Sequence, residues 1–189
     1  MTLNRNKKIV ISGGPGSGKS TLIQLLQNKG YYCFEEFSRS LLDKSTSEIE
    51  KNYFKSKPLE FSELVWKKRL KDLREAEKLR FNKDRPFVFF DRGLLDVIAY
   101  LNYINKPFNV NKLNPKNKNY DMVLLLPPWK EIYVNDNHRS ESFEQASSIY
   151  DHIKKTYEYF DIRIVEIPFG SPSERILKIV DIINDGKQH

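Results

Sequence analysis

The chain has 189 residues, of which 39% are hydrophobic and 30% charged, which is the composition of a soluble globular protein and the length of one domain. No apolar run approaches the roughly 18 residues of a membrane span, the N-terminal residues lack the apolar segment of a signal peptide, and the single cysteine, Cys33, fits a reducing cytoplasm. The net charge is +7, and the basic residues are spread along the chain and mixed with acidic ones, without a basic tail. This distribution favours polyphosphate ligands over nucleic acid as partners.

The first predicted elements enclose a glycine-rich segment. Residues 9–11 are a β-branched run typical of a buried strand, and residues 22–30 carry apolar side chains at helical spacing up to Gly30. Between them, residues 13–20 read GGPGSGKS and fit the phosphate-binding loop pattern G-x-x-x-x-G-K-[ST]. A glycine-rich turn that merely caps a helix is the alternative, and the flanking strand and helix argue against it.

Each residue type in this loop has a chemical reason. Glycines let successive backbone N–H groups turn toward phosphate oxygens, and the following helix adds the positive end of its dipole. We expect Lys19 to bind the β- and γ-phosphates of ATP or GTP, and the Ser20 hydroxyl to ligate Mg²⁺. The predicted nucleotide-binding residues are Gly13, Gly14, Pro15, Gly16, Ser17, Gly18, Lys19, Ser20 and Thr21.

The second predicted strand, residues 31–34, runs directly into the sequence EEFSR. Glu36 and Arg39 are three residues apart and would share one face of a helix. An acid and an arginine at a strand end suit an acceptor that has hydroxyl groups and an anionic or planar group. We therefore predict that both bind a substrate, with an ion pair on a helix surface as the alternative.

A long helix with a solvated face of mixed charge is predicted over residues 59–81, and the apolar strand 87–90 after it ends at Asp91-Arg92-Gly93. Asp91 stands at the end of a strand, where a protein with a phosphate-binding loop needs an acidic residue. It would hold Mg²⁺ or accept a proton from a substrate hydroxyl, and capping the next helix is its alternative role. Arg92 is expected to bind substrate at the mouth of the cleft, with a surface salt bridge as the alternative.

Residues 129–145, after the fourth predicted strand, have the composition of a mobile lid. Arg139 lies in a polar stretch just before an amphipathic helix, and we predict that it closes over the transferring phosphoryl group as a catalytic residue. An ordinary exposed arginine is the alternative. Trp129, at the start of this region, is expected to pack in the core rather than on the lid base or on a ligand.

Two later helices carry capping signals. Ser142 with Gln145 fits a capping box, and Ser171 is followed by a proline and by Glu174. The turn PFGS at residues 168–171 precedes the second of these helices. By analogy with the fold alone, its backbone is suitably placed to contact a purine ring.

Strands and helices alternate along the chain, which predicts an α/β protein with a three-layer α/β/α arrangement and a mainly parallel sheet of five strands. The strands are expected at residues 9–11, 31–34, 87–90, 122–126 and 162–167, with helices at 22–30, 59–81, 94–104, 143–160 and 172–185. In such sheets ligands bind beyond the carboxyl ends of the strands, where the polar residues named above are found. We expect one domain over residues 1–189.

Five motifs resemble the P-loop kinases of the nucleoside and nucleotide kinase group: GGPGSGKST at 13–21, EEFSR at 35–39, DRG at 91–93, DNHRSE at 136–141 and PFGS at 168–171. Over almost the whole chain, the sequence is most similar to short bacterial proteins labelled AAA family ATPase and related to the ribosylnicotinamide-kinase domain. This resemblance implies a sheet in the order 2-3-1-4-5, ATP with Mg²⁺, and phosphoryl transfer or slow hydrolysis. The second helical domain and sensor region of a ring-forming AAA+ ATPase have no counterpart in the sequence.

These observations predict a kinase for a small nucleoside- or nucleotide-like acceptor. The residues we assign are catalytic Lys19, Asp91 and Arg139, substrate-binding Glu36, Arg39 and Arg92, and the magnesium ligands Ser20 and Asp91. The alternative is a regulatory ATPase or GTPase that hydrolyses slowly and signals to a protein or lipid partner. The acids and arginines at the strand ends favour the kinase, because a switch has less need of an acceptor pocket. A nucleic-acid end kinase is supported by the positive charge alone.

Overall fold

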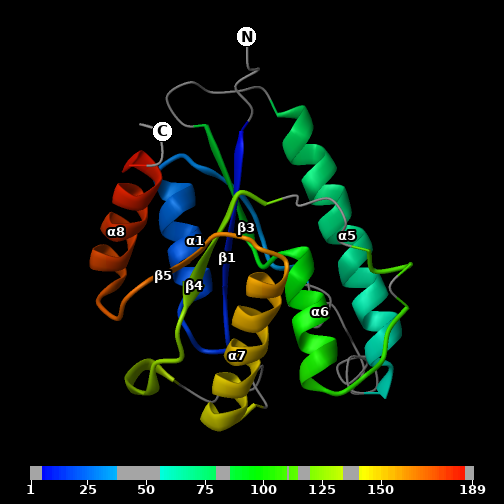
Figure 1. Ribbon diagram of the computed structural model, residues 1–189. Helices are drawn as coiled ribbons and strands as arrows, with labels where there is room; N and C mark the ends of the chain where they lie inside the picture. The colour runs from blue at the N-terminus through cyan, green and yellow to red at the C-terminus, as the bar shows by residue number, and fades with distance from the viewer. Residues whose placement is uncertain are drawn as a thin grey trace, which may run out of the picture.

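The computed structural model describes residues 6–37, 56–79, 86–109, 111–114, 120–133 and 141–185 (Figure 1). Its strands are β1 (Lys7–Gly13), β2 (Tyr32–Phe34), β3 (Phe87–Asp91), β4 (Met122–Leu126) and β5 (Ile164–Glu166). They form one parallel sheet in the order β2-β3-β1-β4-β5. The predicted α/β class and the strand order 2-3-1-4-5 are therefore confirmed.

Helices cover both faces of this sheet. They are α1 (Lys19–Asn28), α5 (Pro58–Lys78), α6 (Leu94–Tyr103), α7 (Phe143–Tyr159) and α8 (Pro172–Asp185), with a short 3₁₀ helix η1 (Lys130–Ile132) after β4. Figure 1 shows α1 and α8 on one side of the sheet and α5, α6 and α7 on the other. None of the helices in the described part of the chain is both long and apolar enough to span a bilayer.

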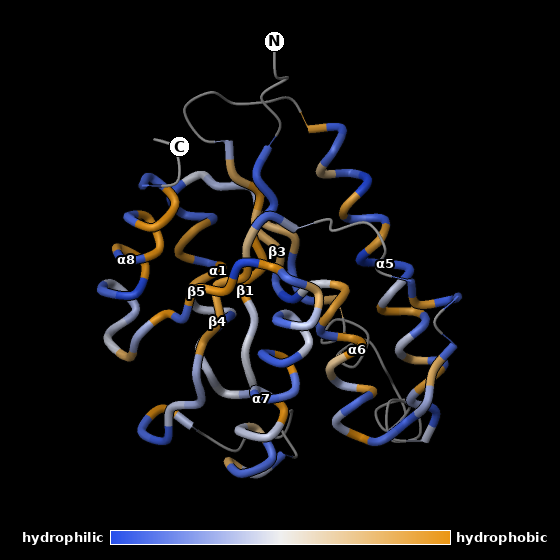
Figure 2. The backbone as a smooth tube through the Cα atoms, in the orientation of Figure 1, coloured by the Kyte–Doolittle hydropathy of each residue, from blue (hydrophilic) through white to orange (hydrophobic). Residues whose placement is uncertain are grey.

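Alternating side chains of the central strands build a separate core on each face. In β1, Val10 joins the cluster under α5, α6 and α7, whereas Ile9 and Ile11 join the cluster under α1 and α8. Figure 2 shows the strands as a hydrophobic centre between helices whose hydropathy alternates along their length. Because a parallel sheet covered on both faces needs apolar side chains on both, its strands are continuous apolar runs, which is why the sequence pattern located them.

Two predicted capping boxes fix where α7 and α8 begin. At α7, the Ser142 N–H donates to Gln145 Oε1 at 2.7 Å, and the Gln145 N–H donates to Ser142 Oγ at 3.3 Å. At α8, the Ser171 N–H donates to Glu174 Oε2 at 2.7 Å, and the Glu174 N–H donates to Ser171 Oγ at 3.3 Å. Each exchange satisfies N–H groups that the first turn of a helix would otherwise leave unpaired.

The strand register brings the loops that carry polar residues to one edge of the sheet. Ile11 of β1 is paired with Asp91 of β3, and Gly13 is paired with Leu126, the last residue of β4. Phe34, at the end of β2, is level with Phe90. The segments after β1, β2, β3 and β4 therefore leave the sheet side by side, at the position where ligands bind in sheets of this kind.

Candidate active site

The loop between β1 and α1 needs glycine for two physical reasons. Gly16 and Gly18 have φ angles of 74° and 88°, in the left-handed region that side chains with a Cβ rarely adopt. Gly14 lies directly against α7, where an added Cβ would collide with the carbonyl oxygen of Ala146. The glycines thus allow both the curl of the backbone and its close approach to a neighbouring helix.

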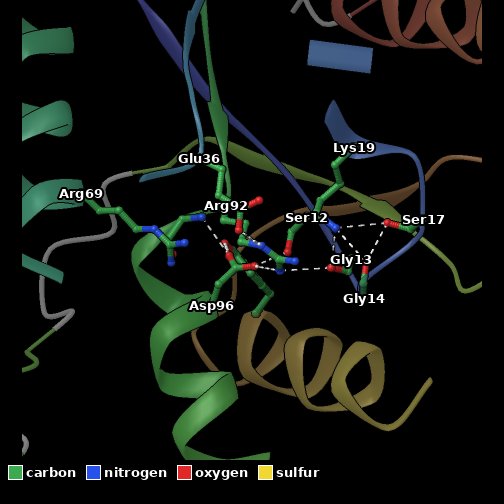
Figure 3. Close-up of polar contacts among 11 residues, drawn as sticks. Ser12, Gly13, Gly14, Ser17, Lys19, Glu36, Arg69, Arg92 and Asp96 are labelled. Carbon is green, nitrogen blue, oxygen red and sulfur yellow. Dashed lines mark hydrogen bonds and ion pairs between the residues drawn. The ribbon is translucent and has the colours of Figure 1, made fainter. Parts of the chain in front are cut away.

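Lys19, the first residue of α1, is buried with its ammonium group on this loop. Its Nζ donates to the carbonyl oxygens of Gly14 at 2.7 Å and Gly13 at 3.1 Å, and to Ser17 Oγ at 3.3 Å (Figure 3). Burial, assisted by the positive charge of Arg92, lowers the pKa of Lys19 to about 7. The Lys19 amine therefore lies on the loop that the motif predicts to bind phosphate oxygens.

Arg92 ties the loop to the ends of β2 and β3. Its Nε donates to Glu36 Oε1 at 3.0 Å, and its Nη1 donates to the Gly13 carbonyl at 3.1 Å and to Asp96 Oδ1 at 3.4 Å. The side chains of Arg92 and Glu36 are each only 16% exposed. Their ion pair is therefore not the surface salt bridge that we considered for Arg92. Contact of either residue with a substrate stays a prediction.

Arg39 and Arg139 lie outside the residues that the structure describes, so their roles stay predictions. In the described part of the predicted lid region, the Tyr133 hydroxyl donates to the carbonyl oxygen of Glu141. The Tyr133 ring lies against the phosphate-binding loop, since a Cβ on Gly16 would come within 2.7 Å of ring atom Cδ2. Through Tyr133, the predicted lid region adjoins the loop.

Asp91, the last residue of β3, belongs to the same group of side chains as Lys19, Glu36 and Arg92, and it is 6% exposed. Its Oδ1 is buried and has no hydrogen-bond partner among the residues that the structure describes. Burial, followed by the negative charge of Glu36, raises the pKa of Asp91 to about 6, while Lys19 and Arg92 oppose the rise. Buried polar atoms are nearly always satisfied in folded proteins, and an exception at a strand end fits an oxygen that receives a proton or a cation.

The chemistry of these side chains also fits Mg²⁺. Within the described ranges, no group of three or more His, Cys, Asp or Glu side chains could hold a metal ion. Magnesium at nucleotide sites usually takes one or two protein oxygens and fills its remaining positions with phosphates and water. The Asp91 carboxylate and the hydroxyl of Ser20, in the first turn of α1, suit that mode. Ligation by these two residues stays a prediction.

Asp96 organises the turn after β3, although the sequence motifs do not single it out. Its buried carboxylate accepts hydrogen bonds from the Gly93 N–H at 2.8 Å, the Tyr157 hydroxyl at 2.7 Å and Ser12 Oγ, besides the bond from Arg92. The signal in the sequence is an acidic residue inside an otherwise apolar helix, three residues after a glycine. Asp96 therefore supports the orientation of Arg92 in the site.

Arg69 of α5 is a second residue that the motifs miss. It is buried, and its Nη1 donates to the carbonyl oxygen of Gly93 at 2.7 Å. Its charge acts against the rise in the pKa of Asp91, so it contributes to the electrostatics of the site. Arg69 lies four residues from Val65 and four from Leu73, on the buried stripe of the helix, and that position was the available signal.

Trp129 does not pack in the core, and that prediction is wrong. Its ring stacks on Phe169, with ring centroids 5.2 Å apart and planes 24° apart, and Phe169 is 53% exposed. Trp129 follows the end of β4 and Phe169 follows the end of β5, so the stack joins the segments that leave two neighbouring strands. The predicted contact of residues 168–171 with a purine stays a prediction.

The sequence model of a protein family described as an AAA domain matches residues 8–175. The chain belongs to this AAA domain family. Shorter stretches are similar to proteins named nucleotide-binding protein. The one from Vibrio campbellii is 36% identical over 87 residues, which are 44% of this chain and 29% of that protein. The one from Hahella chejuensis is 44% identical over 43 residues, 23% of this chain and 15% of that protein, so each match spans less than a third of the relative's length.

Solved structures of similar fold include deoxyadenosine kinase from M. mycoides with bound dATP, with a TM-score of 0.67 and 19% identity. That comparison covers 94% of this AAA domain chain and 99% of the kinase. Thymidylate kinase from Candida albicans has a TM-score of 0.65 and 20% identity, with 97% and 93% of the two chains covered. These likenesses establish the fold, and they confirm the predicted resemblance to P-loop nucleoside and nucleotide kinases.

Proposed function

We propose that this AAA domain protein binds a nucleoside triphosphate at residues 13–21 and transfers its γ-phosphoryl group to the hydroxyl of a small nucleoside- or nucleotide-like acceptor. The observation that carries the proposal is the buried Asp91 Oδ1, which has no hydrogen-bond partner among the described residues and belongs to a carboxyl group whose pKa burial, Glu36 and Lys19 influence. Binding a nucleotide requires the loop and Lys19, whereas proton transfer or metal binding requires a carboxylate oxygen that is not already used. The fold shared with deoxyadenosine kinase and thymidylate kinase supports the acceptor class.

On the donor side, Lys19 exchanges the loop carbonyl oxygens for phosphate oxygens when the triphosphate binds. The negative charge of the phosphates raises the pKa of Lys19 from about 7, so the amine is fully charged in the complex. Backbone N–H groups of residues 13–20, except Pro15, donate to the same phosphates. Arg139 of the predicted lid region neutralises the charge that develops on the transferring group.

On the acceptor side, Asp91 takes the proton of the acceptor hydroxyl as that oxygen bonds to the γ-phosphorus. The bond from the γ-phosphorus to the bridging oxygen breaks, and the nucleoside diphosphate leaves with the electron pair. With a pKa of about 6, Asp91 is mostly ionised at neutral pH and is still basic enough to accept a proton. When bound, Mg²⁺ would be held by Ser20, and by Asp91 if that carboxylate positions the metal instead of accepting the proton, and it would neutralise charge on the phosphates.

The ion pair beside Asp91 holds the acceptor in this proposal. Glu36 can accept hydrogen bonds from sugar hydroxyls, and the Arg92 guanidinium can donate to an anionic or planar group. Their 3.0 Å bond fixes both groups before substrate arrives, which lowers the cost of ordering them. Arg39, three residues after Glu36, completes the acceptor site.

A panel of acceptors tests this function. The purified protein is incubated with labelled ATP, or with labelled GTP, in Mg²⁺ and in the presence of ribonucleosides, deoxynucleosides, nucleoside monophosphates or vitamin-like alcohols, and phosphorylated products are separated. We expect at least one acceptor to be phosphorylated by the natural protein and by Lys178→Met, whose lysine is exposed on α8, but not by Lys19→Met. Hydrolysis at a rate that no acceptor raises would contradict the kinase and favour a regulatory NTPase.

A further inference from the structure

Arg175 contacts the phosphate-binding loop from α8, on the face of the sheet opposite α6 and α7 (Figure 1). It is the fourth residue of α8, which lies beside α1, and it is 4% exposed. Its Nη1 donates to the carbonyl oxygen of Ser17 at 3.0 Å. An added Cβ on Gly18 would lie 3.0 Å from the same nitrogen, so the guanidinium is in close contact with the loop backbone.

Most of the hydrogen-bonding capacity of this guanidinium is unused. Its Nε and Nη2 are buried and find no acceptor in the described part of the chain. Burial lowers the pKa of Arg175, and no acidic residue among those that the structure describes counteracts it. An arginine keeps its charge in such surroundings, so the described residues include a buried cation next to the predicted nucleotide loop for which they supply no acidic counterpart.

The contact with Ser17 sets the direction of the next peptide group. A trans peptide is planar, and its C=O and N–H point to opposite sides of the chain. Because the Ser17 carbonyl points to Arg175, the N–H of Gly18 points away from Arg175. Ser17 also accepts a hydrogen bond from Lys19 at its side chain, 3.3 Å from Nζ, so its backbone and side chain are each held by a different cation.

We propose that Arg175 is a positioning residue of the nucleotide site and its second cation: it turns the Gly18 N–H toward the phosphates, and bound polyphosphate balances its charge. The inference rests on the nucleotide binding proposed above but not on the acceptor. Since the contact is made through the loop, the base of the nucleotide plays no part in it. A positive charge in a buried position attracts phosphates across the thickness of a loop, because protein screens charge less than water does.

Three substitutions separate the roles of this side chain. Arg175→Met removes both charge and donors at similar length, Arg175→Gln keeps a donor for Ser17 without the charge, and Arg175→Lys keeps the charge. Arg163→Met, at an exposed position before β5, is the matched control. Calorimetry measures the Kd for Mg·ATP and for inorganic tripolyphosphate, which has no base. Thermal unfolding of the ligand-free proteins reports on structure alone.

We expect Arg175→Met to raise the Kd for both ligands by about tenfold, Arg175→Gln by slightly less, and Arg175→Lys by less than about threefold. The ligand-free Arg175→Met protein should melt no lower than the natural one, because an unpaired buried charge is removed. Arg163→Met should match the natural protein in both measurements.

Four results would overturn the inference. Weaker binding of ATP with unchanged binding of tripolyphosphate would indicate a base contact. Equal losses in the Lys and Met variants, with a lower melting temperature, would indicate a structural role. Unchanged Kd values would remove any role of Arg175. If the natural protein bound neither ligand, the proposed nucleotide binding would fall as well, which separates that failure from the other three.

Discussion

The pKa values of Lys19 and Asp91, which lie at one edge of the sheet, are shifted toward each other. Burial lowers the pKa of Lys19 to about 7 and raises that of Asp91 to about 6, and each group partly opposes the shift of the other. A buried base and a buried acid thus change charge within a narrow range near neutral pH. Such a pair is poised to respond to the negative charge of a nucleotide, and its behaviour can be measured.

Nucleotide binding is expected to take up protons. At about pH 8, Lys19 with a pKa of about 7 is mostly neutral in the free protein, and phosphate oxygens raise its pKa, so binding should take up close to one proton. Calorimetry in two buffers with different ionisation enthalpies measures this uptake. Asp91→Asn isolates the contribution of Lys19 and should retain the uptake. Equal binding enthalpies in both buffers would contradict the low pKa of Lys19.

Asp91→Asn is expected to stabilise the protein and inactivate it. Asp91 has a pKa of about 6 in the folded state and about 4 in the unfolded state, so its contribution to the unfolding free energy is full below about pH 4 and is lost as the pH rises through about 6. At about pH 8 the Asn variant should therefore be more stable by on the order of 1–3 kcal/mol, with kcat reduced about a hundredfold or more.

Denaturant unfolding across this pH range checks the stability, and the acceptor assay checks the activity. Asp151→Asn, at an exposed position on α7, is the matched control and should change neither quantity. An Asn variant at position 91 that is less stable than the natural protein at about pH 8 would show that ionised Asp91 has an unrecognised favourable partner.

The Glu36–Arg92 pair is expected to be energetically coupled. Its side chains are mostly buried and bonded at 3.0 Å, so a double-mutant cycle of Glu36→Gln and Arg92→Met should give a coupling of about 1–3 kcal/mol in unfolding. The exposed Lys154–Glu166 pair, at 2.8 Å, should give less than about 1 kcal/mol. Both single variants at positions 36 and 92 should also raise the KM of the acceptor. A coupling as small as that of the exposed pair would rule out a pre-ordered pair.

Tyr157→Phe tests the support under the site. The Tyr157 hydroxyl is buried and donates to Asp96 at 2.7 Å, so its removal leaves a buried carboxylate short of a donor. We expect a loss of about 1–3 kcal/mol in unfolding free energy. Tyr159→Phe removes the same atom from a side chain that is 84% exposed and should cost less than about 0.5 kcal/mol. Equal losses of unfolding free energy in Tyr157→Phe and Tyr159→Phe would show that the hydrogen bond to Asp96 does not stabilise the fold.

Local patterns were sufficient to predict the strands, the helices and the α/β class, whereas the strand order came from the resemblance to P-loop kinases. Apolar runs located the strands because both faces of the sheet are covered, and the capping boxes at Ser142 and Ser171 marked where α7 and α8 begin. The placement of Asp91 beside the loop followed from parallel strands sharing one carboxyl edge. The strands and capping boxes depend on spacing within one short stretch of chain, and the placement of Asp91 depends on the parallel sheet.

The supporting contacts could not be predicted, because their partners are remote in sequence. Ser12 and Asp96 are 84 residues apart, and Ser17 and Arg175 are 158 apart. No spacing rule links such pairs before the strand order is known. The burial of Trp129 was misjudged for a related reason: its ring stacks on Phe169, which is 40 residues away in the sequence. Long-range packing thus decides the details of the site.

The destination of the γ-phosphoryl group is the most direct test of the account. The natural protein is incubated with ATP, Mg²⁺ and the best acceptor in water labelled with heavy oxygen, and the products are analysed by mass spectrometry. Direct transfer to the acceptor hydroxyl, with Asp91 accepting its proton, predicts a phosphate ester of the acceptor, formed in proportion to ADP, with little labelled inorganic phosphate. If nearly all of the γ-phosphoryl group appeared as labelled inorganic phosphate with every acceptor, the kinase account would be wrong.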